Sequence, residues 1–324
     1  MKAMVYTKYG TPDVLQLKEV EKPGPEDNEV LIKVHAASVN SWDWDLLRGT
    51  PFVNRLMFGL LKPKVILGCD IAGRVEAVGR NVKQLQPDDE VFGDLSGCGW
   101  GGFAEYVCPR ENALALKPAC LTFEQAAAVP QAALLALQGL RYKGQIQPGQ
   151  KILINGAGGG VGTFAVQMAK SLGAEVTGVD STQKLEVVRS LGADHVIDYT
   201  QEDFTKNGKP YDMILDVAGF RSIYDYRRVL GPGGVYVMIG GSSALVFQLM
   251  FLGPWISMVG SKKMGILLHK PNKGLDYMTG LFEAGKVVSV IDRRYPLSEA
   301  ADALRYFGAG LARGKVVITL EEYL

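Results

Sequence analysis

The chain has 324 residues, about twice the length of a typical domain, and 47% of them are hydrophobic, which is enough for a sizeable buried core. Its 35 lysines and arginines nearly balance its 34 aspartates and glutamates. This balance excludes a basic face over the whole chain, so nucleic acid is not the expected partner. The four cysteines follow no disulfide or metal pattern, and the first residues begin a strand instead of a signal sequence. We therefore expect a two-domain enzyme in the reducing cytoplasm.

The first third of the chain is typical of β structure. Three segments alternate or run apolar like strands, with few helical periods between them: Glu29–His35, Ile71–Val78 and Glu90–Phe92. The pattern predicts a separate, mostly β domain over residues 1–121.

A dinucleotide-binding pattern follows the short apolar run Ile152–Ile154. Ala157, Gly159 and Gly162 hold the i, i+2 and i+5 places of the nucleotide fingerprint, with Ala in place of the first Gly. Missing Cβ atoms let the backbone approach a phosphate. The helix beyond Gly160 then presents unpaired amides, and its dipole favours the negative charge of a pyrophosphate.

Strands and helices continue to alternate after this turn. The strand Glu175–Val179 ends at Asp180, 18 residues after Gly162, close to where an acid meets the adenosine ribose. Further strands are expected at His195–Ile197, Tyr211–Val217 and Val235–Ile239, with helices at Leu185–Leu191 and Tyr224–Leu230. Five strands alternating with helices predict an α/β domain with a doubly wound parallel sheet over residues 122–266.

The remaining residues, 267–324, are expected to return to the first domain. The predicted elements are a helix at Leu275–Ala284, a strand at Lys286–Ile291, a helix at Ser298–Phe307 capped by Ser298, and a strand at Lys315–Leu320.

Several short motifs occur in one order along the chain. They are Ala37–Asn40 with Asp43, Leu67–Gly73, Glu76–Gly79, Asp89–Gly93, Gly101–Val107, Gly156–Lys170, Ser190–Val196, Tyr295–Ala300 and Gly314–Val317. In this order they resemble the medium-chain dehydrogenase/reductase superfamily, specifically its zinc-independent quinone oxidoreductase-like branch. The resemblance spans nearly the whole chain. It implies a chaperonin-10-like (GroES-like) β domain, a Rossmann domain, and a cleft between them where nicotinamide meets substrate.

The resemblance also predicts that no metal is bound. The superfamily's alcohol dehydrogenases hold catalytic zinc with Cys, His and Cys, and those places fall here on Asn40, Cys69 and Gln131. Two of the three are poor zinc ligands, and Cys98 and Cys108 lack the close spacing of a structural zinc site. A zinc-type alcohol dehydrogenase is therefore the weaker alternative.

Without a metal, the chemistry that suits a nicotinamide is hydride delivery to an electrophilic carbon of an enone, alkenal or quinone. The protein must position the carbonyl and offer a donor to the developing enolate oxygen. Asn40 is the main catalytic candidate because its amide can orient nicotinamide or substrate, and the alternative is a loop Asn that closes a turn. Asp43 belongs to the same motif and is equally well explained as a helix cap. Cys69 is expected to line the substrate cleft.

The expected cofactor is NAD(P)H. Asp180 favours NADH because a carboxylate binds both ribose hydroxyls and repels a 2′-phosphate. The family leans towards NADPH, and Ser181 and Lys184 offer groups for that phosphate. The predicted cofactor-binding residues are Ala157, Gly158, Gly159, Gly160, Val161, Gly162, Asp180, Ser181, Lys184, Val217, Gly240 and Gly241.

Residues 244–259 form a long apolar stretch. It fits a lid over a lipophilic substrate, a dimer face or a peripheral membrane contact, while Gln248 and Pro254 argue against a membrane span. His269 and Lys270 follow it and are candidates for the substrate pocket. The family's habit implies a homodimer. Some relatives of zeta-crystallin type keep the fold without catalysis, so a non-catalytic NADPH-binding, membrane-associated or crystallin-like protein is a further alternative.

Overall fold

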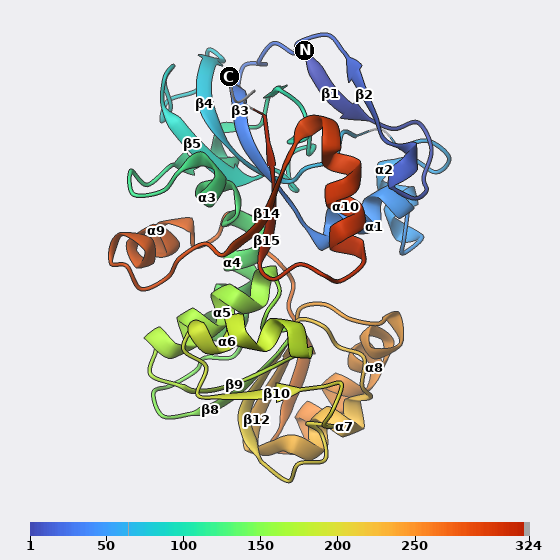
Figure 1. Ribbon diagram of the computed structural model, residues 1–324, viewed down its shortest axis with the longest axis vertical. Helices are drawn as coiled ribbons and strands as arrows, with labels where there is room; N and C mark the ends of the chain where they lie inside the picture. Colours follow the sequence, from blue (N-terminus) through green and yellow to red (C-terminus); the bar gives the residue numbers. More distant parts are fainter. Residues whose placement is uncertain (64, 321–324) are drawn as a thin grey trace. The chain divides into compact units, whose positions relative to one another are not determined.

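The computed structural model describes residues 1–63 and 65–320 and divides the chain into two compact units (Figure 1). Unit 1 comprises Met1–Ala132, Pro271–Glu283 and the residues from Ser289 onwards. Unit 2 comprises Ala133–Lys270 and Ala284–Val288. The first boundary thus falls inside helix α4 (Pro130–Leu137), and a short piece of the late chain belongs to unit 2.

Unit 1 is built on a seven-stranded sheet with the order β14-β15-β3-β4-β5-β7, and β6 pairs with β3. The strands are β3 (Val30–Val39), β4 (Asp70–Val78), β5 (Glu90–Asp94), β6 (Tyr106–Val107), β7 (Ala115–Leu116), β14 (Ile291–Pro296) and β15 (Lys315–Thr319). The antiparallel pairing of β15 with β3 joins this late strand to the sheet of unit 1. A separate hairpin joins β1 (Lys2–Val5) to β2 (Gln16–Glu19).

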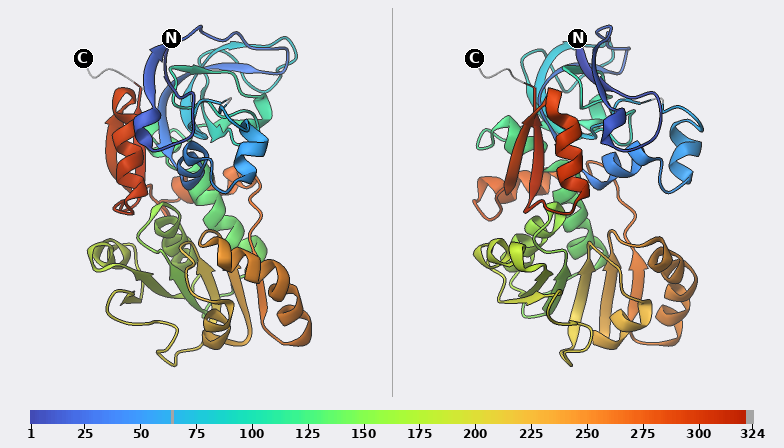
Figure 2. Two further views of the ribbon diagram at one scale, coloured as in Figure 1. Left: turned by 90° about the vertical axis from the view of Figure 1, so that its right-hand side faces the viewer. Right: turned by 45° about the vertical axis from the view of Figure 1, so that its right-hand side comes forward.

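The helices of unit 1 cover this sheet and its ends. They are α1 (Ser41–Arg48), α2 (Val53–Phe58), α3 (Phe123–Ala127), α9 (Leu275–Glu283) and α10 (Ala300–Gly308). Helix α10 packs against β14 and β15, beside which it lies in both views of Figure 2. Its buried Ala300, Ala303 and Leu304 recur at helical spacing, so one apolar face meets the sheet.

Unit 2 is a six-stranded parallel sheet with the order β10-β9-β8-β11-β12-β13. Its strands are β8 (Lys151–Asn155), β9 (Glu175–Asp180), β10 (His195–Asp198), β11 (Tyr211–Asp216), β12 (Leu230–Met238) and β13 (Lys263–Ile266). Its helices include α5 (Gly160–Ser171), α6 (Leu185–Ser190), α7 (Ile223–Val229) and α8 (Ser243–Val259). The doubly wound sheet is as predicted, with β13 as an added sixth strand.

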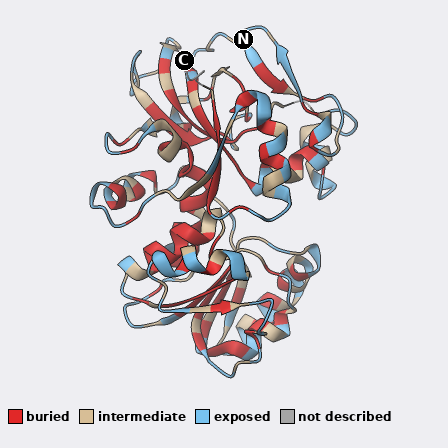
Figure 3. Ribbon diagram, viewed as in Figure 1, coloured by how far each residue is buried: buried red, intermediate tan, exposed pale blue. Residues whose placement is uncertain are grey.

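The strand order reverses direction between β8 and β11, because β9 lies on one side of β8 and β11 on the other. Such a switch point opens a crevice at the carboxyl ends of the strands, where ligands of open α/β sheets bind. The apolar run Ile152–Ile154 in β8 is fully buried. Figure 3 colours most of the sheet of this unit as buried. The sheet core therefore fixes the end of β8, from which the glycine turn departs.

The predicted strand Lys286–Ile291 is wrong. Residues 286–290, which the structure describes, form no strand, and β14 begins only at Ile291. The Gln167 amide donates to the Val288 carbonyl at 3.0 Å and accepts from the Val288 N–H at 2.8 Å. A side chain thus takes both backbone groups that a neighbouring strand would have used. Helix α10 also starts later than predicted, at Ala300, because a 3₁₀ turn over Leu297–Glu299 precedes it.

Candidate functional site

The glycine turn after β8 is packed too closely for side chains at two of its positions. A Cβ on Gly162 would lie 2.1 Å from the Gly156 carbonyl oxygen, and one on Gly158 would lie 2.6 Å from the Lys184 Cβ. At Gly159, the residue that precedes α5, a Cβ would meet only the Gly156 oxygen at 3.6 Å, an ordinary contact. Packing therefore does not require glycine at Gly159, which is the position where the fingerprint brings backbone and pyrophosphate together. The turn fits a dinucleotide.

Asp180 lies beside this turn, as its spacing in the sequence predicts. It ends β9 with only 6% of its surface exposed. One carboxylate oxygen accepts the Gly158 N–H and the other accepts the Ser181 N–H, both at 2.8 Å. Each oxygen keeps a further lone pair for another donor such as a ribose hydroxyl. The structure thus brings Gly158, Asp180, Ser181 and Lys184 together.

The loops after β11 and β12 carry three more predicted cofactor residues, Val217, Gly240 and Gly241. Backbone hydrogen bonds hold the two loops together, from the Gly219 N–H to the Gly240 oxygen at 3.0 Å and from the Ser242 N–H to the Gly219 oxygen at 2.8 Å. A Cβ on Gly241 would lie 2.3 Å from the Gly219 oxygen, so this approach needs glycine. These contacts hold the two loops in place at the carboxyl ends of β11 and β12.

Asp216 is a site residue that the sequence reasoning missed. It is fully buried at the end of β11 and accepts hydrogen bonds from the Tyr236 hydroxyl at 2.6 Å and the Asn155 amide at 2.8 Å. Burial raises the pKa of this carboxyl group. The same Asn155 amide donates to the Ala218 carbonyl at 2.9 Å, which ties the ends of β8 and β11 together. An aspartate at the end of a strand was the feature of the sequence that could have identified Asp216.

In unit 1, the three places that correspond to zinc ligands come together around one sulfur atom. The Asn40 and Gln131 side-chain amides donate towards the Cys69 Sγ at 3.4 and 3.5 Å. Asn40 also donates to Asp70 at 2.9 Å, and its carbonyl oxygen accepts from the Lys315 ammonium at 2.6 Å. The orientation of the Asn40 amide is therefore determined, because Lys315 can only donate and Asp70 accepts.

Asp43 is fully buried and acts first as a structural anchor of α1. Its carboxylate accepts the Asn40 and Gly68 backbone N–H groups, both at 2.8 Å. Burial raises the pKa of Asp43 to about 7, while the hydrogen bonds from Gly68 and Asn40 oppose that rise. The contact with the N–H of Asn40 places this side chain at the start of the helix that Asn40 precedes, as the capping alternative predicts.

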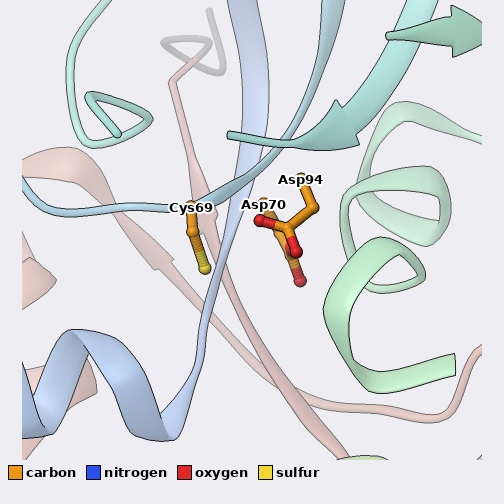
Figure 4. A group of neighbouring side chains, drawn as sticks. All are labelled: Cys69, Asp70 and Asp94. Carbon is orange, nitrogen blue, oxygen red and sulfur yellow. The ribbon is translucent and has the colours of Figure 1, made fainter. Parts of the chain in front are cut away.

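Figure 4 shows three side chains of this polar cluster, Cys69, Asp70 and Asp94. Their possible ligand atoms lie within 4.8 Å of one another. Burial raises the pKa of the Cys69 thiol well above its usual range, so the thiol stays protonated at neutral pH. Burial also raises the pKa of Asp70 to about 6, against the lowering effect of the nearby Lys315. The Lys315 ammonium, 3.7 Å from Asp70 Oδ2, already supplies a positive charge.

Lys315 is the second residue that sequence reasoning missed. It appeared only within the motif Gly314–Val317, yet its side chain is 2% exposed and donates to the Val39 carbonyl at 3.3 Å and to Asn40. A lysine at the start of a buried strand was the available signal, because buried lysines are almost always paired.

The remaining pocket candidates are divided between the units. Cys69 lies in unit 1, while His269 and Lys270 lie in unit 2. The Gln138 side chain bonds the backbone of Lys270 on both sides, to its carbonyl at 2.8 Å and from its N–H at 3.0 Å. This fixes the backbone there, and the side chain of Lys270 is exposed. Their role in substrate binding stays a prediction.

Family models match three parts of the chain. Residues 26–119 match the alcohol dehydrogenase GroES-like domain, 191–318 a zinc-binding dehydrogenase model, and 135–218 the C-terminal domain of alanine dehydrogenase/PNT. The chain is 37% identical over 334 residues to a 2-methylene-furan-3-one reductase of Solanum lycopersicum, covering 98% of this chain and 79% of that protein. It is 34% identical to a chloroplast envelope quinone oxidoreductase homolog of Arabidopsis thaliana, over 98% of both.

Among solved structures, the quinone oxidoreductase from Coxiella burnetii matches with a TM-score of 0.90 and 31% identity, over 99% of each chain. The Escherichia coli quinone oxidoreductase complexed with NADPH matches with a TM-score of 0.87 and 26% identity, over 99% of this chain and 100% of that one. The chain therefore belongs to the medium-chain dehydrogenase/reductase superfamily, in its quinone oxidoreductase-like branch. The expected Rossmann and GroES-like domains and the NAD(P)H-dependent oxidoreductase class are confirmed.

Replacing Lys315 by Met should lower the free energy of unfolding by about 3–5 kcal/mol, because it leaves Asp70 buried without its cation. Loss of the ammonium raises the folded-state pKa of Asp70 further above its unfolded value. The deficit relative to wild type should then be largest at alkaline pH and shrink as acid protonates Asp70.

Urea unfolding of both proteins at about pH 5 and at about pH 8, below and above the pKa of about 6 for Asp70, measures this deficit. Lys33→Met is the matched control, since Lys33 is an exposed lysine on β3. Equal small losses in the two variants, or a deficit independent of pH, would show that Lys315 does not neutralise Asp70.

Proposed function

We propose that this chain is an NAD(P)H-dependent reductase that works without a catalytic metal. Its proposed substrates are lipophilic enones and alkenals, which it reduces at the conjugated C=C bond, and quinones. The observation that carries the proposal is the polar cluster around Cys69, in which the Asn40 and Gln131 amides stand at the two places where cysteines would hold zinc. Relatives of the chain are named a 2-methylene-furan-3-one reductase and an NADPH-dependent alkenal/one oxidoreductase. These names support a substrate with a carbon–carbon double bond next to a carbonyl.

The donor set around Cys69 does not fit zinc. Structural and catalytic zinc sites use deprotonated cysteine, histidine and carboxylate ligands, whereas the Asn40 and Gln131 amide N–H groups point towards the sulfur. A protonated thiol and a lysine within the same buried cluster further disfavour a divalent cation. We therefore propose that hydride transfer here proceeds without Lewis-acid activation by zinc.

The glycine turn and the strand ends of unit 2 are proposed to hold the cofactor, which when bound supplies a hydride. The amides at the start of α5 would hold the pyrophosphate, and Asp180 would accept hydrogen bonds from the adenosine ribose. The loops at Val217 and Gly240–Gly241, which backbone hydrogen bonds hold together, would hold the nicotinamide. Asp180 favours NADH, and Ser181 with Lys184 allows NADPH to bind as well.

In unit 1, Asn40 is proposed to orient nicotinamide or substrate. Lys315 and Asp70 fix its amide, and its contacts to the Ser38 oxygen and the Cys69 sulfur are long, at 3.4 Å. The N–H that makes only these long contacts is the one that we propose donates to a ligand. Asp43 positions Asn40 through its backbone N–H and stays the weaker catalytic candidate.

We further propose a homodimer in which the outer face of α8 is covered. Phe247, Phe251, Trp255 and Met258 are 60–76% exposed on this helix, which is apolar on all sides. Contact with a membrane surface through residues 244–259 is the alternative, and sedimentation analysis separates the two. Among the described residues, no helix is long and apolar enough to cross a membrane. Cytoplasmic location stays a prediction.

The purified protein should oxidise NAD(P)H in the presence of enones or quinones while containing no stoichiometric zinc, because the Cys69 cluster lacks ligands for it. Elemental analysis and loss of reduced-nicotinamide absorbance measure the two quantities on one sample. One zinc per chain, with activity lost on chelation and restored by zinc, would revive the alcohol dehydrogenase alternative.

Asp180→Ala should shift the ratio of NADH to NADPH affinity towards NADPH by about five- to thirtyfold, since it removes a charge that repels the 2′-phosphate. Both affinities should also fall together, because Gly158 loses its hydrogen-bond acceptor. The ratio cancels this common loss. Titration of wild type, Asp180→Ala and Lys184→Met with both reduced cofactors gives the ratios, and Lys184→Met should shift them in the opposite sense. A wild type with strong NADPH preference that Asp180→Ala leaves unchanged would contradict the assignment.

A further inference from the structure

Trp100 has an unusual backbone conformation for a bulky residue. Its φ is +67°, and its neighbours Gly99 and Gly101 have φ of +105° and +110°. Positive φ is rare for side chains of this size and is energetically unfavourable. Such conformations persist only where the surroundings enforce them, and they concentrate at ligand-binding sites.

The indole of Trp100 also carries an unused hydrogen-bond donor. Its side chain is 4% exposed, and the Nε1–H is buried with no partner among the described residues. Buried indoles normally find an acceptor, and leaving the N–H unpaired is destabilising. The unpaired Nε1–H of Trp100 is therefore available to a hydrogen-bond acceptor on a ligand.

The surroundings of Trp100 connect it to the candidate site. The Trp100 N–H donates to the Leu95 carbonyl at 3.2 Å, and the Leu95 N–H donates to the Cys69 carbonyl at 2.6 Å. Trp42, on α1 two residues after Asn40, stacks on the Trp100 ring with centroids 6.3 Å apart. Trp42 is 44% exposed and forms the outer layer of this stack.

Next to the stack lies an apolar surface around α2. Phe58 of α2 meets the Trp100 ring edge-on at 6.0 Å. Arg55 and Tyr9 fix the helix, through the Arg55 Nε to the Gly49 carbonyl at 3.2 Å and the Tyr9 hydroxyl to the Gly59 carbonyl at 2.6 Å. Six apolar side chains of this segment are 51–82% exposed: Phe52, Val53, Leu56, Met57, Leu60 and Leu61.

We propose that Trp100 and Trp42 form a subsite for the planar conjugated carbonyl of the substrate, with the Trp100 Nε1–H donating to its oxygen and the hydrocarbon part lying along α2. This inference rests on the proposed function and names its substrate class as flat, oxygen-bearing and lipophilic. The exposed Trp42 ring turns outwards to admit the substrate ring, which then lies between Trp100 and Trp42 with its oxygen at the Trp100 N–H.

Trp100→Phe tests the donor, because it keeps an aromatic ring and removes the N–H. The probe is a cyclic conjugated ketone, which is flat and cannot be reduced when no cofactor is present, and calorimetry measures its Kd without cofactor. We expect Trp100→Phe to raise that Kd about five- to tenfold, typical of one lost hydrogen bond. The Kd of NADH should not change. The matched control is Trp255→Phe, an exposed tryptophan of α8 in unit 2.

A second variant keeps the proposal testable if Trp100→Phe does not fold. Leu56→Ser with Met57→Ser changes only exposed side chains. Across enones of increasing alkyl chain, wild-type kcat/KM should rise about twofold to fourfold per methylene, and the double variant should flatten this dependence.

Equal ketone Kd values in wild type and folded Trp100→Phe, or an unchanged chain-length dependence, would overturn the subsite while enone reduction stands. A wild type that reduces no enone or quinone, yet loses ketone binding in Trp100→Phe, would instead overturn the proposed function and leave the subsite in place.

Discussion

The buried ammonium of Lys315 is the charge on which the polar cluster of unit 1 depends. Asp43, Asp70 and Asp94 are all fully buried in one small volume, and Lys315 is 3.7 Å from Asp70. Without that cation, the carboxylates would have to take up protons or expose themselves to water. The same ammonium sets the direction of the Asn40 amide at 2.6 Å. Lys315 thus determines both the charge balance of the cluster and the orientation of the Asn40 amide within it.

This contact explains why the tail of the chain belongs to unit 1. Lys315 begins β15, and the antiparallel pairing of β15 with β3 brings it to Asn40, 275 residues earlier in the chain. In unit 2, the corresponding constraint is the turn after β8, where the Gly158 N–H binds Asp180 across 22 residues. Each unit therefore depends on a contact between its strand ends, and the chemistry proposed for the protein is placed at those ends.

Local patterns in the sequence predicted most of the strands and the cofactor turn, for physical reasons. Apolar runs such as Ile152–Ile154 have to be buried, and the glycines after them permit the close approach that Gly162 shows. The distance from Gly162 to Asp180 follows from one helix and one strand, so the meeting of Asp180 with the turn could be predicted from spacing.

Features that depend on distant partners could not be predicted in this way. A lysine in a buried strand indicates that it has a partner, but nothing local in the sequence identifies Asn40 as that partner, and β13 is only four residues long. The region 286–291 has the composition of a strand, but the Gln167 side chain satisfies its backbone instead. The positive φ of Trp100 contradicts the intrinsic preference of that residue, so only the folded surroundings can explain it.

We propose that hydride passes from the nicotinamide to the carbon–carbon double bond of a conjugated carbonyl. Reduction of an enone with nicotinamide cofactor deuterated on the transferred position, followed by NMR of the product, tests it most directly. We expect the product to be a saturated ketone with deuterium on the β-carbon and hydrogen from water on the α-carbon. Deuterium on the carbonyl carbon of an allylic alcohol, or a product without label, would contradict it.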